Sequence, residues 1–140
     1  MKKGKIIAQA GVIPFTIKNK KLRLLIITNS RRNKWLFPKG LVEKNMTREE
    51  SAVMEAYEEA GVMGEIIPNK IGSYEIEKYG SLCRIEMFPM LVEKVLLSWP
   101  EDKIRKRKWI ASDEVEKYIK DKKILKISDK FNKMELRKLI

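Results

Sequence analysis

One segment constrains the fold of this chain more than any other, because its sequence predicts a helix that is capped at both ends. The segment spans residues 47–60. Thr47 is a favourable N-cap residue, and Glu50 completes a capping box with it. Gly61 is a residue type that commonly ends a helix in the left-handed conformation. Strand-like apolar runs lie on both sides of this helix, so the sequence predicts one α/β domain over residues 1–140.

The other elements follow from apolar runs and turn residues. Two apolar runs, 6–17 and 22–28, flank a polar turn and predict a hairpin, in which Gly11 and Pro14 mark a kink or an edge position. A short apolar piece at 35–37 is stopped by Pro38. Further strands are expected at 64–67, 72–76, 82–95 and 107–110, and further helices at 112–120, N-capped by Ser112, and at about 129–139. The sequence has no internal repeat or low-complexity tract.

Composition excludes several kinds of site. The chain has no histidine, so histidine triads, histidine metal ligands and histidine general bases are excluded. Cys83 is the only cysteine, which excludes an intramolecular disulfide and favours a reducing compartment, the cytoplasm. No apolar run approaches the ~20 residues that a membrane span needs, so we expect no membrane partner.

The formal net charge of +12 is placed unevenly. Of the 31 basic residues, 11 lie in residues 1–42, which contain no acidic residue. The other 20 basic residues lie in residues 43–140, together with all 19 acidic residues. Such a field attracts polyanions, whether nucleic acid, a membrane surface or a phosphorylated small molecule. The alternative for each single lysine is a solvated strand edge or hairpin tip.

The helix over residues 47–60 carries Glu55, Glu58 and Glu59 on one face, since successive residues turn by about 100°. The apolar face opposite, which should pack on the sheet, holds Val53, Ala56, Tyr57 and Ala60. Three neighbouring carboxylates repel one another, and the helix dipole disfavours them near its C-terminus. A hard divalent cation, Mg²⁺ or Mn²⁺, would compensate. An acidic face paired with lysines elsewhere is the alternative.

Residues 40–62 resemble the Nudix box, in which a glycine, a glutamate and the pattern Arg-Glu-aliphatic-x-Glu-Glu-x-Gly-aliphatic recur at fixed spacing. The positions that match the box are Gly40, Glu55, Ala56, Glu58, Glu59, Gly61 and Val62. Residues 35–40 also look like the stretch that usually leads into it. The resemblance implies the Nudix fold, a mixed β-sheet sandwiched between helices.

Two box positions depart from the family pattern. Met46 stands in place of the first glutamate, and Met54 in place of an arginine that helps to hold the catalytic carboxylates in the family. The missing charges have opposite sign, so we interpret them as a coupled loss in which an apolar contact replaces a charged one. A looser site would lower the rate of catalysis.

The resemblance implies a hydrolase that cleaves a pyrophosphate bond in a nucleoside diphosphate derivative, with a divalent cation that activates water. The residues carried over for catalysis or metal binding are Glu55, Glu58 and Glu59, with Gly40 as a further metal ligand. Family members often add an acid from a downstream loop. Glu101 is the first candidate for that metal-binding acid, and Glu86, within a predicted strand, is the second.

The rest of the chain looks most similar to the Nudix branch that holds diadenosine polyphosphate and diphosphoinositol polyphosphate hydrolases, on the stretches 58–64, 71–74 and 99–109. This favours a dinucleoside polyphosphate, such as Ap4A, as substrate. The basic residues that could bind its phosphates are Arg31, Arg32, Lys34 and Lys39.

Two aromatic residues have open roles. Tyr79 stands about where dinucleoside polyphosphate hydrolases place a base-stacking tyrosine, and a structural role in a strand is the alternative. Trp35 is either a core residue or a stacking platform for a base.

Two other functions stay open at this point. The missing charges at Met46 and Met54 motivate a catalytically weak or inactive domain that binds nucleotide as a regulator. The net positive charge motivates a nucleic-acid partner, and hydrolysis of the 5′-end pyrophosphate of RNA would combine such binding with catalysis.

Overall fold

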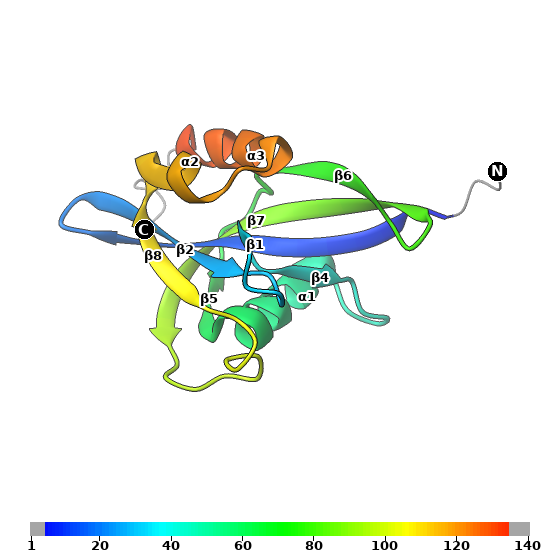
Figure 1. Cartoon of the computed structure of the whole chain (residues 1–140), viewed down its shortest axis with the longest axis horizontal. Helices are drawn as coiled ribbons and strands as arrows, with labels where there is room; N and C mark the ends of the chain where they lie inside the picture. The colour runs from blue at the N-terminus through cyan, green and yellow to red at the C-terminus, as the bar shows by residue number, and fades with distance from the viewer. Residues whose placement is uncertain (1–4, 135–140) are drawn as a thin grey trace.

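The computed structural model describes residues 5–134, and within them eight strands form one mixed sheet (Figure 1). The strands are β1 (Ile7–Lys18), β2 (Lys21–Thr28), β3 (Trp35–Leu36), β4 (Lys39–Leu41), β5 (Val62–Ile66), β6 (Gly72–Lys78), β7 (Ser81–Val95) and β8 (Arg107–Ala111). The sheet order is β3-β2-β1-β7-β5, with β4 beside β1, β6 beside β7 and β8 beside β2. β1 and β7 run parallel, and the other pairs are antiparallel.

β1 lies in the interior of the sheet, so an edge position for Gly11 and Pro14 is wrong. Pro14 lies between residues 9–11, which pair with β4, and residues 15–18, which pair with β2. Its missing N–H therefore interrupts neither antiparallel ladder. The predicted hairpin of β1 and β2 is confirmed, with positive φ at both turn residues, as the tightest hairpin turns require.

Helices cover both faces of the sheet, which confirms the predicted sandwich (Figure 1). The helical elements are α1 (Arg48–Glu55), the π-helical turn η1 (Ala56–Ala60), the 3-10 turn η2 (Ser112–Glu114), α2 (Val115–Tyr118) and α3 (Lys122–Asn132). α1 and η1 pack on one face, whereas α2 and α3 pack on the other. No helix in the described part of the chain is long and apolar enough to cross a membrane.

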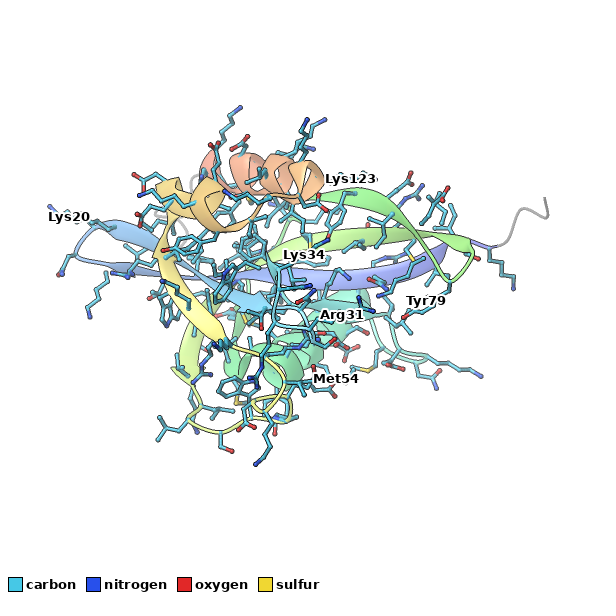
Figure 2. The ribbon with its side chains drawn as sticks, viewed as in Figure 1. Lys20, Arg31, Lys34, Met54, Tyr79 and Lys123 are labelled. Carbon is cyan, nitrogen blue, oxygen red and sulfur yellow. The ribbon has the colours of Figure 1, made fainter. Side chains whose placement is uncertain are left out.

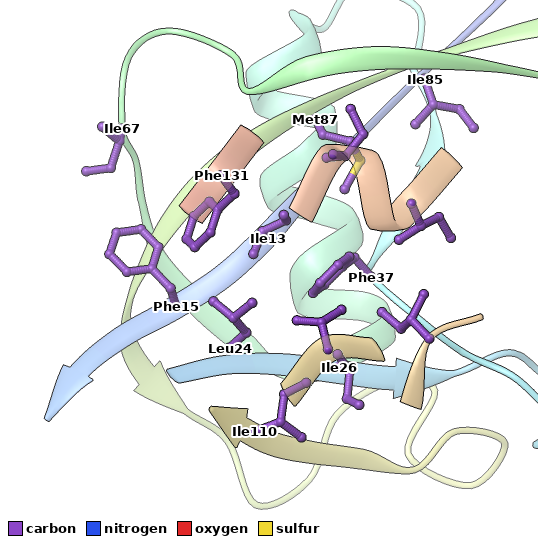
Figure 3. Packing of buried hydrophobic residues seen from close by; sticks show 14 residues of the cluster. Ile13, Phe15, Leu24, Ile26, Phe37, Ile67, Ile85, Met87, Ile110 and Phe131 are labelled. Carbon is purple, nitrogen blue, oxygen red and sulfur yellow. The ribbon is translucent and has the colours of Figure 1, made fainter. Parts of the chain in front are cut away.

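The sheet separates two apolar cores because alternate residues of β1 and β2 point to opposite faces. In the core beneath α3, the rings of Phe15 and Phe131 meet edge to face with centroids 5.5 Å apart (Figure 3). The core beneath α1 and η1 contains Ala52, Ala56 and Ala60. These small side chains let α1 and η1 lie close to the strands. Together α1 and η1 are called the acidic helix below, because they carry Glu55, Glu58 and Glu59.

The predicted helix over residues 47–60 is present, but it changes from α to π geometry after Glu55. The capping box is confirmed, since Thr47 Oγ1 accepts from the Glu50 backbone N–H at 3.0 Å and Glu50 Oε1 accepts from the Thr47 N–H at 2.8 Å. Gly61 ends the helix with a φ of 65°, as expected. A π-helical turn inside a helix often marks a functional site.

The C-terminal helices differ from the prediction. Residues 112–120 form η2 and the short α2 rather than one helix, and Ser112 makes no capping bond. α3 begins seven residues earlier than expected, because Asp121 accepts from the backbone N–H groups of Lys123 and Ile124 and caps the helix there. The last residues of the predicted helix, 135–139, lie outside the described residues.

Candidate active site

Two of the three glutamates of the acidic helix are buried in the protein interior. Glu55 ends α1, and Glu58 and Glu59 lie in η1. The exposed fractions of Glu55 and Glu59 are only 8% and 7%, whereas Glu58 is half-buried. Tyr57 is 41% exposed, so the expectation that it packs on the sheet is wrong. The glutamates therefore do not form a solvated acidic stripe.

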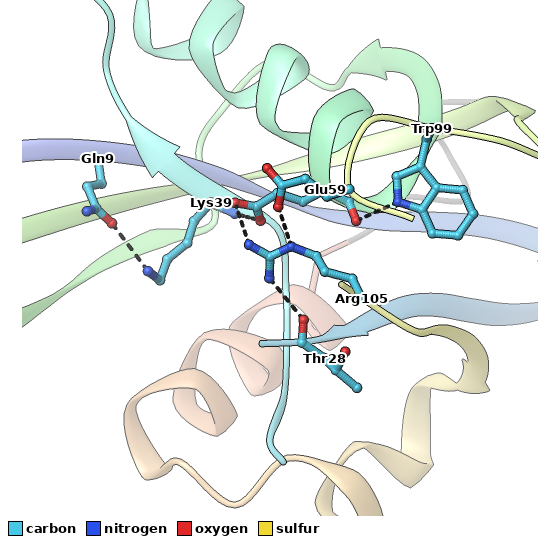
Figure 4. Close-up of polar contacts among 7 residues, drawn as sticks. Gln9, Thr28, Lys39, Glu59, Trp99 and Arg105 are labelled. Atoms are coloured by element: carbon cyan, nitrogen blue, oxygen red, sulfur yellow. Dashed lines mark hydrogen bonds and ion pairs between the residues drawn. The ribbon is translucent and has the colours of Figure 1, made fainter. Parts of the chain in front are cut away.

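β4 approaches these two carboxylates with its backbone. A Cβ atom at Gly40 would lie 2.5 Å from each carboxylate oxygen of Glu55, so only glycine fits there without movement. Lys39 donates its backbone N–H to Glu59 Oε1 at 3.2 Å, and its ammonium group donates to Gln9 Oε1 at 3.4 Å (Figure 4). The segment that leads into the box thus forms one wall of the site.

Burial alters the protonation of these groups. It raises the pKa of Glu55, and it raises the pKa of Glu59 to about 8 against the opposing charge of Arg105. Burial, followed by the charge of Lys78, lowers the pKa of Lys39. Each group is less readily charged here than in water, and a bound ion of opposite sign would reverse that effect.

The loop over residues 96–106, between β7 and β8, contributes an arginine that sequence reasoning missed. Arg105 Nη2 lies 3.3 Å from Glu59 Oε2, and its Nε lies 2.7 Å from Glu101 Oε1. Glu101 also donates its backbone N–H to the carbonyl of Glu58 at 3.0 Å. The loop therefore brings Glu101 beside the acidic helix. The spacing of Glu101 and Arg105 was visible in the sequence, but nothing local indicated that Arg105 would pair with Glu59.

Glu86, the second candidate for the downstream acid, lies in a different environment. Its carboxylate pairs with Arg48 at the start of α1 and with Lys70 Nζ, 2.7 Å away. These two cations already neutralise it. The structure thus brings Glu101, and not Glu86, into contact with the residues around Glu59.

Trp99 and Arg107 bind the backbone carbonyls at the C-terminal end of the acidic helix. Trp99 Nε1 donates to the carbonyl of Glu59 at 3.0 Å, and Arg107 Nη1 donates to the carbonyl of Ala60 at 2.8 Å. The guanidinium lies 3.9 Å from the centroid of the Trp99 ring. A side chain at Gly61 would collide with both of them, which gives this glycine a second role besides its positive φ.

The basic residues expected to bind phosphate are divided between a loop and the wall of the site. Arg31, Arg32 and Lys34 lie exposed in the loop before β3, where Arg32 donates to the carbonyl of Lys103. Lys39 alone contacts a box glutamate. Figure 2 shows Lys20 at the tip of the β1–β2 hairpin, far from Arg31.

Tyr79 lies in the turn between β6 and β7 rather than within a strand. Its φ is 57° and its side chain is 70% exposed. The preceding Lys78 lies 5.1 Å from the centre of its ring. The ring of Tyr79 therefore lies in solvent beside a positive charge.

Trp35 belongs to the core beneath α3, where its ring meets Tyr118 edge to face at 6.2 Å. Of its two possible roles, the structure supports the core role. Met46 and Met54 are both half-buried and belong to neither apolar core. Their mutual contact stays a prediction.

The donor types of the acidic cluster suit a divalent cation. Glu55 and Glu59 are buried neighbours, and within residues 5–134 Arg105 is the only cation that forms an ion pair with either of them. Carboxylate and carbonyl oxygens are the ligands that Mg²⁺ and Mn²⁺ prefer. No three acidic side chains of the described region already surround one point. Binding through three carboxylates would therefore require a side chain to change rotamer.

Comparison with known proteins identifies the class to which this fold and acidic site belong. The NUDIX domain family matches residues 7–131, so the chain belongs to the Nudix hydrolases, enzymes that cleave pyrophosphate bonds. Nudix hydrolase 16, mitochondrial, of Arabidopsis thaliana is 36% identical over 123 residues, which cover 75% of this chain and 68% of the relative.

Two solved structures share the fold. A C. elegans Ap4A hydrolase in a binary complex has a TM-score of 0.77 at 20% identity, covering 91% of this chain and 96% of the hydrolase. The NUDIX domain of Shewanella oneidensis NrtR, complexed with ADP ribose, has a TM-score of 0.74 at 12% identity and covers 98% of this chain and 90% of that domain. At these identities the likeness concerns the fold alone.

Proposed function

We propose that this chain hydrolyses a dinucleoside polyphosphate of the Ap4A type, or a related polyphosphorylated nucleotide, in a reaction that depends on Mg²⁺ or Mn²⁺. The observation that carries this proposal is the pair of buried carboxylates, Glu55 and Glu59, against the backbone of β4. The Ap4A hydrolase of the same fold supports the substrate class. We also propose a cytoplasmic location for this chain, whereas the Arabidopsis relative is named mitochondrial.

The residues that would hold the cation are Glu55, Glu58, Glu59, Glu101 and, through its carbonyl, Gly40. When bound, a divalent ion neutralises charge on the phosphates and activates water. The absence of a Cβ at Gly40 lets the backbone of β4 lie against the Glu55 carboxylate. The Lys39 N–H orients Glu59 through a hydrogen bond of 3.2 Å.

The substrate would extend from this acidic pair toward the basic residues. Lys39 lies nearest, since its backbone contacts Glu59 and its ammonium group reaches toward Gln9. Arg31 and Lys34 in the exposed loop could contact further phosphates, with arginine offering bidentate contacts. The exposed ring of Tyr79 offers a stacking surface for a base.

The test is a hydrolysis screen with Mg²⁺ or Mn²⁺ over diadenosine polyphosphates, nucleoside triphosphates, ADP-ribose, diphosphoinositol phosphates and capped RNA. The release of products is measured by chromatography, because cleavage of one pyrophosphate bond between two nucleosides frees no inorganic phosphate. We expect release from a diadenosine polyphosphate and a loss on the order of 100-fold in Glu59→Gln, because a misplaced functional group costs about that much. Glu65→Gln, which alters an exposed acid of β5, is the matched control and should leave release unchanged.

Two other outcomes would replace the proposal. Tight nucleotide binding without release of product from any substrate would favour a regulatory domain. The missing charges at Met46 and Met54 are the sequence feature that suggests this alternative. Release confined to RNA, with binding that weakens steeply as salt rises, would favour an RNA 5′-end pyrophosphohydrolase.

A further inference from the structure

Arg105 connects three parts of the chain that lie far apart in the sequence. Its Nε contacts Glu101 at 2.7 Å and its Nη2 contacts Glu59 at 3.3 Å. Its Nη1 donates to the backbone carbonyl of Thr28, at the end of β2, at 2.9 Å (Figure 4). The side chain is only 13% exposed. One guanidinium thus joins the loop over residues 96–106, the acidic helix and the sheet.

The position of this guanidinium is itself held by the backbone. Thr28 donates its N–H to the carbonyl of Lys106 at 2.9 Å, and Lys106 returns an N–H to the Thr28 hydroxyl at 2.9 Å. Within the loop, Arg105 donates its own N–H to the carbonyl of Glu101 at 3.1 Å. The planar fork of arginine can therefore fix the direction of each carboxylate, which a flexible single ammonium cannot do.

The acidic helix supplies no cation of its own for these carboxylates. Neither the last turn of α1 nor η1 contains a basic residue. Among the ion pairs of the described residues, Arg105 is the one that reaches Glu59. Its charge also opposes the burial that raises the pKa of Glu59. Without Arg105, the buried carboxylate of Glu59 would lose the only ionic partner that it has among residues 5–134.

We propose that Arg105 is a positioning residue, which holds Glu59 and Glu101 in one arrangement and thereby couples the loop over residues 96–106 to the acidic helix. Arg105 acts through the two glutamates and needs no contact with the reacting atoms. The expected effect of Arg105 on catalysis rests on the proposed function. The expected coupling of the loop to the acidic helix does not rest on it.

A double-mutant cycle tests the catalytic part. In Arg105→Met we expect kcat to fall on the order of 100-fold while KM changes little, because only the catalytic arrangement is lost. Arg105→Met combined with Glu101→Gln should lose less than the product of the two single losses, since Arg105 acts in part through Glu101. Losses that multiply in the double variant, or an unchanged kcat in Arg105→Met, would overturn the proposal.

Two further variants keep the test decisive. Arg105→Lys preserves the charge beside Glu59 but cannot span both glutamates and Thr28, so it should fold and still lose most of the kcat. A kcat equal to that of the parent would refute positioning by the guanidinium. Arg84→Met removes an exposed ion pair with Glu75 and is the matched control, which should leave kcat unchanged.

Hydrogen exchange of the metal-free chain separates this inference from the proposed function, because it needs no substrate. The amides of Glu101 and Arg105 should exchange at least tenfold faster in Arg105→Met than in the parent or in Arg84→Met. Equal exchange would overturn the coupling even if the chain is an active hydrolase. Faster exchange in a chain that hydrolyses nothing would uphold the coupling and reject the proposed function.

Discussion

Replacing Gly40 with alanine tests whether the close approach of β4 to the acidic helix belongs to the working protein. The added Cβ would lie 2.5 Å from both carboxylate oxygens of Glu55, whereas ordinary contact begins at 3.4 Å. The carboxylate or the strand must therefore move by roughly 1 Å. Overpacking of this kind costs about 1–3 kcal/mol in the free energy of unfolding, and a displacement of roughly 1 Å costs on the order of 100-fold in rate.

Urea denaturation measures the first effect, and kcat on the substrate found in the screen measures the second. Gly72→Ala is the matched control, because its Cβ would meet the flexible ends of Ile127 and Lys130 at 3.3 Å. It should cost less than about 1 kcal/mol and leave kcat unchanged. If Gly40→Ala behaves like Gly72→Ala in both assays, the contact between β4 and Glu55 does not shape the site and the reasoning is refuted.

Three further predictions concern the acidic helix. Burial raises the pKa of Glu59 to about 8 from an ordinary 4.5, so proton binding to Glu59 stabilises the folded state. This contribution to the free energy of unfolding is fully present below pH 4.5 and is lost as the pH rises through 8. With a chelator present, Glu59→Gln should therefore gain stability relative to the parent between pH 5 and pH 8, and a constant difference would contradict this. Restoring both charges, with Met46→Glu and Met54→Arg together, should raise kcat about tenfold or more if the coupled loss loosens the site, whereas unchanged kcat and metal affinity would argue against it. Trp99→Phe removes the hydrogen bond to the Glu59 carbonyl and should lower the free energy of unfolding by about 1 kcal/mol, which an unshifted urea midpoint would disprove.

The acidic helix could be predicted because its signals are local. The capping box and the glycine after the last turn determine where it begins and ends, and the helical repeat determines that its glutamates share a side. The change to π geometry after Glu55 has no such signal. The start of α3 was missed although its cap, Asp121, is a local signal, because the prediction of this helix rested on the apolar spacing nearer the C-terminus.

The interior position of β1 could not be predicted from its own residues. Its parallel pairing with β7 joins segments with no common turn, and the Gly11 and Pro14 pattern suited an edge equally well. Likewise, the four basic residues before the box look equivalent in sequence. Only burial distinguishes Lys39, whose backbone contacts Glu59, from Arg31 and Lys34 in the exposed loop.

The sequence by itself determined the chemistry available to this protein: three carboxylates at one helix end, a glycine before them, no histidine, and two charges absent from the family motif. The tertiary structure alone decided which carboxylates are buried and which cation accompanies them. Arg105 reaches Glu59 only because β8 pairs with β2 and returns the loop over residues 96–106 to the acidic helix. Helical spacing is a property of a few neighbouring residues, whereas burial and ion pairing depend on segments that meet only when the chain is folded.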